Sequence, residues 1–456
     1  MSILKKPSLI VLLFFISFSF VFMDLFRSWH LEQTNFKYDV AHYYAYLPAY
    51  AYNNGSMQFN NESDWYLITS PKGKKTTKVT YGMAAMYSPF FLLGHKIASN
   101  EKAKLDGFSL PYAITIHWGS IFYCLLGMFF LRNFLIHHFD EKVTSVVLLL
   151  VFLGTNLFAY TYFYSEMSHG YLFTLFSALL YLSNSFYEKP SSYKFVILGI
   201  LLGLISLIRP VDILFSVVFF LWGVVNLNEF KNRILFYLTN PRTLITLSIV
   251  VLIWVPQCLF WKENMGSYLY FSYPGENFFW NDPQIINILF SYRKGWMLYT
   301  PIVIFMFIGF LFMKKQHGRN RMSIIIIVLL IIYIYSCWWD WTFGGGFGGR
   351  VFVPYYAILA LPLGAFIKWI LSSTVSKFIY TIKTVSIFCL FYLMCLNIGQ
   401  TYQGVIGLVH FSSMTEKSYW ITFGKFTISG QTSGDYWGSL KDPNYKDLSS
   451  GANRDQ

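Results

Sequence analysis

Asp39 has the clearest chemical potential in the sequence, because it follows the first long apolar run within the polar and aromatic residues 37–44. A carboxylate can accept a proton from an attacking hydroxyl or amine, so Asp39 is a candidate general base. Aspartate is also favoured as the N-cap of a helix, and a helix beginning at Val40 leaves that structural role open. His42, one helical turn farther on, either orients the carboxylate and lines its cavity or has no chemical role.

Glu166 and His169 form a second polar pair, in a short turn between two apolar segments. Residues three apart share one face of a helical turn, so both side chains are expected to face the same space. A metal site would need at least one further ligand, and none can be identified from the sequence. Ionisable groups beside long apolar segments are often functional, so we expect these two residues to line a cavity.

Arg209 lies at the end of another apolar segment, directly before Pro210. Its guanidinium could form an ion pair with Asp212, three residues later, or reach along the apolar surface toward water. Alternatively, it could bind a phosphate group.

A glycine-rich segment, residues 344–349, separates Trp339 and Asp340 from Arg350. Glycines permit a tight backbone with exposed amides, and Trp339 offers a face on which a sugar or an isoprenoid could stack. Arg350 can make a bidentate contact with phosphate, and we expect Asp340 to line the same cavity. The segment has neither the spacing of a nucleotide-binding phosphate loop nor that of a dinucleotide-binding loop. A tightly packed turn between helices is the alternative.

The elements that must position these residues are predominantly apolar. Hydrophobic residues make up 55% of the chain and charged residues 12%, and runs of roughly 20 apolar residues recur along it. The sequence therefore predicts an all-α polytopic membrane protein. The eleven expected spans are residues 8–26, 111–131, 143–162, 170–186, 195–208, 211–225, 244–261, 296–313, 322–339, 351–371 and 378–398.

The orientation follows from basic residues, which collect in cytoplasmic loops. The loops that carry them are residues 132–142, 189–194, 231–242, 314–321 and 368–377. The amino terminus is then inside, and the long segments 27–110, 262–295 and 399–456 are outside, where long loops usually carry function. These loops account for the net charge of +13, and no basic stripe with interleaved aromatics predicts nucleic-acid binding.

The first long outer segment contains two apolar stretches, residues 40–52 and 81–94. Both are expected to be helices in the membrane interface, although 81–94 could instead be a twelfth span. Between them lies a basic run, residues 71–78, which is either a solvated turn or a contact for an anion such as a lipid phosphate. The sequence therefore predicts two parts, a transmembrane bundle over residues 1–398 and an outer tail over residues 399–456. The tail is expected to be loosely ordered near its end.

Together these features resemble the GT-C superfamily of membrane glycosyltransferases, especially the branch of protein O-mannosyltransferases and aminoarabinose transferases. The resemblance covers most of the chain, from the first span to Pro354. It implies a GT-C-like bundle whose first outer loop holds a catalytic acidic residue, here Asp39, and two interfacial helices. It also implies a donor-phosphate-binding lysine before the second of these helices, where Lys78 lies. Residues 348–350 are similar to the late glycine-rich pattern of the family.

Two positions depart from that family. The acidic pair Asp-Glu of this branch is Asp39-Val40 here, and its Lys-Pro-Pro-Leu-like motif is reduced to residues 78–81. The missing second carboxylate disfavours a two-carboxylate metal site, so the resemblance implies chemistry without a metal or other cofactor.

The resemblance implies transfer of a sugar, with inversion, from a polyprenyl-phosphate donor to a glycan, lipid or protein acceptor. The reaction would take place on the periplasmic side of a bacterial inner membrane. Asp39 would deprotonate the acceptor, while Lys78 and Arg350, with Arg209, would stabilise the leaving phosphate. One alternative is a polysaccharide polymerase or ligase that uses a lipid diphosphate-linked glycan. Another is a lipid or glycan transporter, which would place its charges near the membrane midplane.

Overall fold

The computed structural model describes residues 6–25, 36–273, 275–314, 318–452 and 454, so the first outer loop is described from residue 36 onward. Helices dominate these residues. The named strands are two short antiparallel segments, β1 (Ile68–Thr69) and β2 (Lys75–Thr76), within the first outer loop. The prediction of a helical protein is therefore confirmed.

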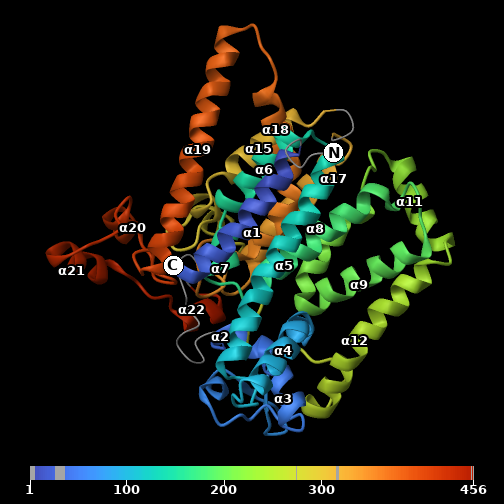
Figure 1. Cartoon of the computed structure of the whole chain (residues 1–456), viewed down its shortest axis with the longest axis vertical. Coiled ribbons are helices and arrows are strands. Elements are labelled where there is room, and N and C mark those ends of the chain that lie inside the picture. Colours follow the sequence, from blue (N-terminus) through green and yellow to red (C-terminus); the bar gives the residue numbers. More distant parts are fainter. Residues whose placement is uncertain (1–5, 26–35, 274, 315–317, 453, 455–456) are drawn as a thin grey trace.

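Long apolar helices make up the body of the molecule (Figure 1). They are α1 (Pro7–Leu25), α5 (Leu110–Ile136), α6 (Glu141–Leu153), α8 (Ser168–Phe186), α9 (Ser192–Ile208), α12 (Thr243–Met265), α17 (Arg321–Cys337), α18 (Tyr356–Leu371) and α19 (Lys377–Val405). Shorter helices connect them: α7 (Leu157–Tyr162), η3 (Pro210–Phe215), α10 (Ser216–Phe220), α11 (Leu227–Thr239), α13 (Ile285–Phe290), α14 (Trp296–Tyr299), α15 (Val303–Gly309), η4 (Phe310–Phe312) and η5 (Arg350–Tyr355).

Among the described residues, four helices are long and apolar enough to cross a membrane. They are Leu110–Ile136, Thr243–Met265, Arg350–Leu371 and Lys377–Val405. The other predicted spans are also helical, and several of them are short or interrupted. For example, the predicted span 296–313 is divided into α14, α15 and η4, and Pro301 lies at the first break, where its missing N–H prevents a continuous helix.

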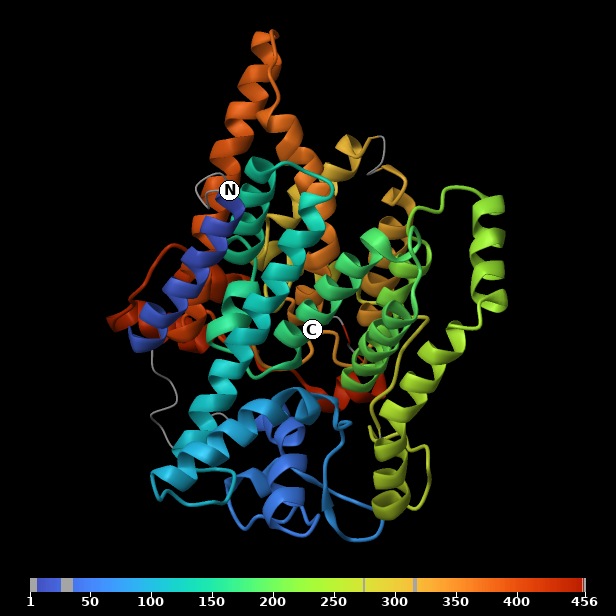
Figure 2. The same cartoon turned by 45° about the vertical axis from the view of Figure 1, so that its right-hand side comes forward.

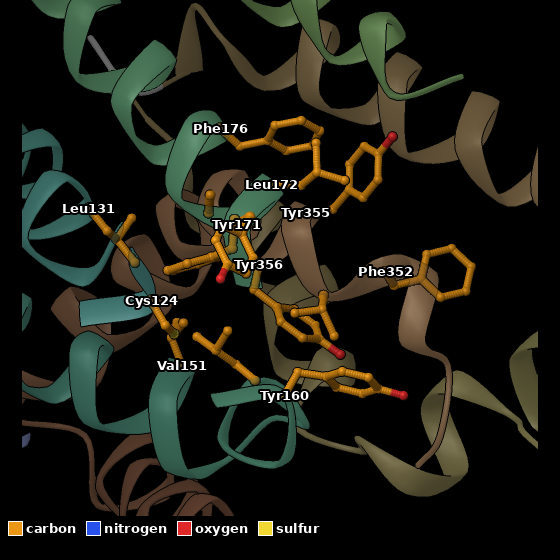
Figure 3. Close-up of a cluster of buried hydrophobic side chains, with 14 of the residues drawn as sticks. Cys124, Leu131, Val151, Tyr160, Tyr171, Leu172, Phe176, Phe352, Tyr355 and Tyr356 are labelled. Carbon is orange, nitrogen blue, oxygen red and sulfur yellow. The ribbon is translucent and has the colours of Figure 1, made fainter. Parts of the chain in front are cut away.

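The core packs η5 and α18 against the helices α5 to α8 (Figure 3). Phe176 of α8 stacks on Phe215 with ring centres 3.8 Å apart, and it meets Tyr355 edge-on at 5.2 Å. A Cβ atom at Gly127 of α5 would lie 2.9 Å from Thr174 Cα, so a glycine is needed for the close approach of α5 and α8. This packing fixes η5, the helix that begins with Arg350.

Three helices of the first outer loop gather at one end of the molecule, opposite the turn between α18 and α19 (Figures 1 and 2). They are α2 (Tyr38–Tyr44), α3 (Tyr46–Tyr52) and α4 (Gly82–Asn100). The two predicted helices of this loop are thus present, but Ala45 divides the first and the second continues to Asn100. Tyr46 of α3 packs against Phe260 of α12, with ring centres 4.9 Å apart, which joins this end to a candidate membrane helix.

The carboxyl-terminal segment forms α20 (Glu416–Thr422), α21 (Gly430–Ser439) and α22 (Tyr445–Ser450). The expectation of a loosely ordered end stays a prediction, because it falls partly on residues outside the described ones. The side chain of Arg454 is buried. Its guanidinium donates hydrogen bonds to the carbonyls of Ser336, at 3.2 Å, and Trp338, at 2.7 Å. The Trp338 carbonyl directly follows the end of α17, while the carbonyl of Ser336, in the last turn of α17, also accepts the backbone N–H of Gln284 at 3.0 Å. Arg454 therefore ties the carboxyl-terminal segment to the end of α17.

Candidate active site

Asp39 and Arg350 are far apart in the sequence but form an ion pair, with Arg350 Nη2 3.0 Å from Asp39 Oδ2. The Asp39 side chain keeps 36% of its surface exposed, so a ligand can reach it. The N-cap of α2 is Lys37, and no side chain caps this helix, which disfavours the capping role considered for Asp39. The preceding residue, Tyr38, has a φ of +52°, a strained conformation of the kind that is common at functional sites.

The charges around Asp39 keep it ionised. Burial raises the pKa of Asp39, but the positive charges of Arg350 and Lys78 outweigh this effect, and the pKa lies below its usual range. His42 is buried beside it, and burial together with Lys78 lowers the pKa of His42 to about 4. At neutral pH the pair is therefore a carboxylate beside a neutral imidazole, and the carboxylate can accept a proton.

Lys78 reaches the site from the segment before α4. Its ammonium lies 3.1 Å from Glu276 Oε1 and 5.2 Å from the centre of the Tyr273 ring. Trp339 Nε1 donates to the other Glu276 oxygen at 3.0 Å, so one carboxylate joins Lys78 to the glycine-rich segment. Glu276 is not predicted by any sequence motif; its only signal is its place in the second long outer segment.

Two other lysines of the basic run have structural contacts. Lys72 donates to the carbonyl of Glu263 at 2.6 Å, beside the end of α12, and Lys75 donates to the carbonyl of Asp64 at 3.1 Å. These two lysines thus belong to a folded loop, and the predicted contact of the run with an anion such as a lipid phosphate stays a prediction. Lys72 and Lys75 stabilise the loop, while Lys78 lies beside Asp39.

Arg209 approaches from the end of α9. Its Nε atom lies 3.8 Å from Asp212 Oδ2, so the ion pair considered from the sequence is present. The pairing leaves Nη1 buried and without a hydrogen-bond partner among the described residues. A buried N–H group without a partner is costly, and such a group in a native protein often marks a missing ligand or water. The guanidinium is therefore available to an anion.

Glu166 and His169 do not face the same space. Glu166 Oε1 lies 2.6 Å from His117 Nδ1 on α5, and Ser165 Oγ donates to its other oxygen at 3.0 Å. Glu166 thus takes part in helix packing rather than lining the space beside Asp39. His169, in the first turn of α8, is buried within electrostatic range of both Arg209 and Arg350, and its Nδ1 has no hydrogen-bond partner among the described residues.

The glycine-rich segment is a tightly packed turn that also delivers Arg350. Gly346 has a φ of +132°, and a Cβ atom there would lie only 2.6 Å from Tyr160 Oη. Tyr160 in turn donates to the carbonyl of Phe347 at 3.2 Å, which ties the segment to α7. Asp340 is buried and accepts the backbone N–H of Thr342 at 3.1 Å, so it mainly shapes this turn.

Lys294 is a further cation that no sequence motif predicts. It is buried, and its ammonium donates to the carbonyls of Gly346 and Phe411, which fastens the carboxyl-terminal segment to the glycine-rich turn. Burial, and then the charge of Arg350, lowers the pKa of Lys294 to about 7. The carboxyl-terminal segment therefore borders the site.

An apolar groove of about 480 Å³ opens between α3, α4 and the carboxyl-terminal half of α12. Its lining residues are Tyr46, Leu47, Tyr50, Ala51, Tyr81, Ala84, Ala85, Ser88, Phe91, Leu92, Pro256 and Phe260. Tyr46 Oη donates to the carbonyl of Val79, the residue after Lys78, at 2.8 Å. The groove thus begins directly beside the segment that carries Lys78.

The structure brings together four of the predicted residues, Asp39, Lys78, Arg209 and Arg350, with His42, His169 and Trp339 around them. Within the described part of the chain, no group of three or more His, Cys, Asp or Glu side chains could hold a metal ion. No family model matches the chain, and comparisons with curated proteins and with solved structures gave no significant match.

Proposed function

We propose that this protein is a membrane glycosyltransferase that moves a sugar from a polyprenyl-phosphate donor to an acceptor. The observation that carries the proposal is the meeting of Asp39 with the cations Lys78, Arg209 and Arg350. Displacement of a phosphate from an anomeric carbon needs a base for the acceptor and positive charge for the leaving group. These four residues supply both, and the unpartnered N–H group of Arg209 supports a phosphate beside it.

In the proposed reaction, Asp39 takes the proton of an acceptor hydroxyl or amine as its oxygen or nitrogen attacks the anomeric carbon. The bond from that carbon to the phosphate oxygen breaks, and its electron pair leaves with the polyprenyl phosphate. Arg350 and Lys78, with Arg209, stabilise the charge that grows on this phosphate. A single displacement inverts the anomeric configuration. We propose this scheme without a metal ion or other cofactor.

The apolar groove supports a lipid-linked donor. It lies between α4 and α12, so an isoprenoid tail could enter it from the membrane along a candidate spanning helix. The tail would then lie on apolar side chains while its phosphate reaches Lys78, next to the groove. We propose, together with this arrangement, a GT-C-like bundle of about eleven spans with its site on the periplasmic side of a bacterial inner membrane.

A donor assay tests the proposal directly. Purified protein is incubated with a panel of polyprenyl-phosphate sugars and an acceptor extract, and the release of polyprenyl phosphate is followed. We expect release with at least one sugar and a loss of about 100-fold or more in Asp39→Asn, because general-base catalysis contributes roughly that factor or more. Asp435→Asn, which changes an exposed carboxylate of α21, is the matched control and should keep full activity. Activity of Asp39→Asn within about threefold of wild type would exclude Asp39 as the base.

The proposed orientation has a separate test in intact cells. In a background without the native cysteines, Ser433→Cys in α21 should react with an impermeant thiol reagent. Val375→Cys, in the fully exposed turn between α18 and α19, should react only after the membrane is opened. The reverse pattern would place the site on the cytoplasmic side.

A further inference from the structure

Each cation of the site lies against a carboxylate of its own. Arg350 pairs with Asp39 at 3.0 Å, and Lys78 pairs with Glu276 at 3.1 Å. The third cation, Arg209, lies 3.8 Å from Asp212. Three positive side chains are thus matched by three carboxyl groups, although the whole chain carries a net charge of +13. The proposed phosphate site is therefore close to neutral before any ligand enters.

The same balance continues toward the carboxyl-terminal segment. Arg293 and Lys294 lie there within electrostatic range of Asp340, and Asp442 acts on Arg293 as well. Because the pKa of Lys294 is about 7, its ammonium carries only part of its charge near neutral pH, and these groups add no net positive charge. Positive charge in this part of the protein is consistently offset, which is unusual for a site that is expected to bind an anion.

Two of the carboxylates can face an entering ligand. Asp39 keeps 36% of its side chain exposed and Glu276 keeps 21%, whereas Asp212 is fully buried and accepts a hydrogen bond from Tyr355 at 2.9 Å. An anion that reaches Arg350 and Lys78 must therefore come close to the charges of Asp39 and Glu276. These carboxylates repel it while the cations attract it.

We propose that Glu276, together with Asp39, determines charge specificity by admitting a donor with one negative charge and disfavouring a donor with two. The inference rests on the proposed function and adds Glu276 to the functional residues. A sugar linked through a phosphodiester carries one charge, and a sugar linked through a diphosphate carries two. Both the attraction to the cations and the repulsion from the carboxylates double for a dianion, so in a site close to neutral the second charge gains no net attraction. The dianion still costs more to remove from water, and it is therefore disfavoured.

The remaining titratable groups around Asp39 do not alter this charge count. His42, on the same helix, is neutral at pH 7 because burial and Lys78 lower its pKa to about 4. The phenols of Tyr43 and Tyr273 also act on Asp39. Burial raises the pKa of each, so both are uncharged. Discrimination between donors of different charge therefore depends on the cations and carboxylates of the site.

The test compares two probes with the same short isoprenyl tail: its methyl phosphate diester and its methyl diphosphate diester, which carry one and two charges near neutral pH. Their affinities for the purified full-length protein in lipid nanodiscs are measured by titration. Wild type should bind the phosphate diester at least as tightly as the diphosphate. Glu276→Gln should bind both probes more tightly, because it removes one repelling charge. The repulsion energy is twice as large for the diphosphate, so its gain in affinity should approach the square of the gain for the phosphate diester. If the phosphate diester gains about threefold, the diphosphate should gain about ninefold.

Glutamine can still accept the hydrogen bond from Trp339, so Glu276→Gln removes charge with little change of shape. Asp39→Asn is a second variant with the same expected direction, and Asp435→Asn is the control without effect. Equal or weaker binding of both probes by Glu276→Gln and Asp39→Asn, or equal gains for the two probes, would overturn the inference while leaving a phosphate donor in place. A clear preference of wild type for the diphosphate would overturn it in favour of a lipid diphosphate donor. Absence of binding in every variant would overturn both the inference and the proposed donor.

Discussion

Arg350→Gln should change the reaction in two separable ways, because Arg350 has two roles in the proposed site. Its guanidinium pairs with Asp39 at 3.0 Å and also contributes positive charge for the donor phosphate. Glutamine keeps a polar side chain but removes the charge. We therefore expect a slower reaction and also a shift in its pH dependence.

The size of the rate loss and the direction of the pH shift follow from the contacts. A lost charge-assisted hydrogen bond to phosphate costs about 1.5–3 kcal/mol, which corresponds to roughly a ten- to hundredfold lower rate. A neighbouring opposite charge lowers the pKa of a carboxyl group, and Arg350 is the nearest such charge to Asp39. Because Arg350 holds the pKa of Asp39 down, its removal raises that pKa. The base is then lost to protonation at a higher pH, so the acid limb of the profile should move upward in pH.

The assay is the pH profile of kcat/KM for the donor, which reports the ionisation of the free enzyme. Arg209→Gln is the matched control, because Arg209 pairs with the buried Asp212 and not with Asp39. It should slow the reaction without moving the acid limb. If Arg350→Gln lowers the rate at every pH by the same factor, or if both variants shift the limb equally, the ion pair with Asp39 does not govern the base.

Three further variants probe the surrounding structure. Arg454→Ala leaves the Trp338 carbonyl without its Arg454 donor and should destabilise the protein by about 1–3 kcal/mol, seen as a lower Tm that Arg454→Lys partly restores; an unchanged Tm would show that Arg454 does not anchor the carboxyl-terminal segment. Gly346→Ala should reduce activity because its Cβ would meet Tyr160 Oη at 2.6 Å, and Tyr160→Phe in the same protein should recover part of the loss; equal activity of wild type and Gly346→Ala would argue against a tight turn. Ala85→Trp fills the apolar groove and should raise KM for a long-chain donor but not for a short-chain one, so equal effects on both would place the lipid tail elsewhere.

Much of the helical architecture is determined by local sequence. A run of apolar residues has few ways to satisfy its backbone in lipid other than a helix, so the positions of α1, α5, α12 and α19 follow from composition and length. Charged residues next to such apolar runs can also be recognised in the sequence, because they stand out from their apolar neighbours. Asp39 and Arg209 could thus be identified as candidates from the sequence alone.

Breaks within the predicted spans depend on more than composition. The predicted span 143–162 is divided into α6 and α7 around Gly154, where the chain packs closely against Ile302. Apolar composition does not distinguish a helix that crosses a membrane from two shorter ones, because both bury the same kind of surface.

Only the tertiary structure decided which charges meet. The pairing of Asp39 with Arg350 depends on how α2 and η5 are brought together by the packing of other helices, and no local pattern encodes that contact. Glu276 and Lys294 lie in segments without a motif, so their role became visible only when folding placed them against Lys78 and the glycine-rich turn. The sequence around a charged residue is the same whether or not the fold places a residue of opposite charge beside it. Its function depends on distances that long-range packing sets.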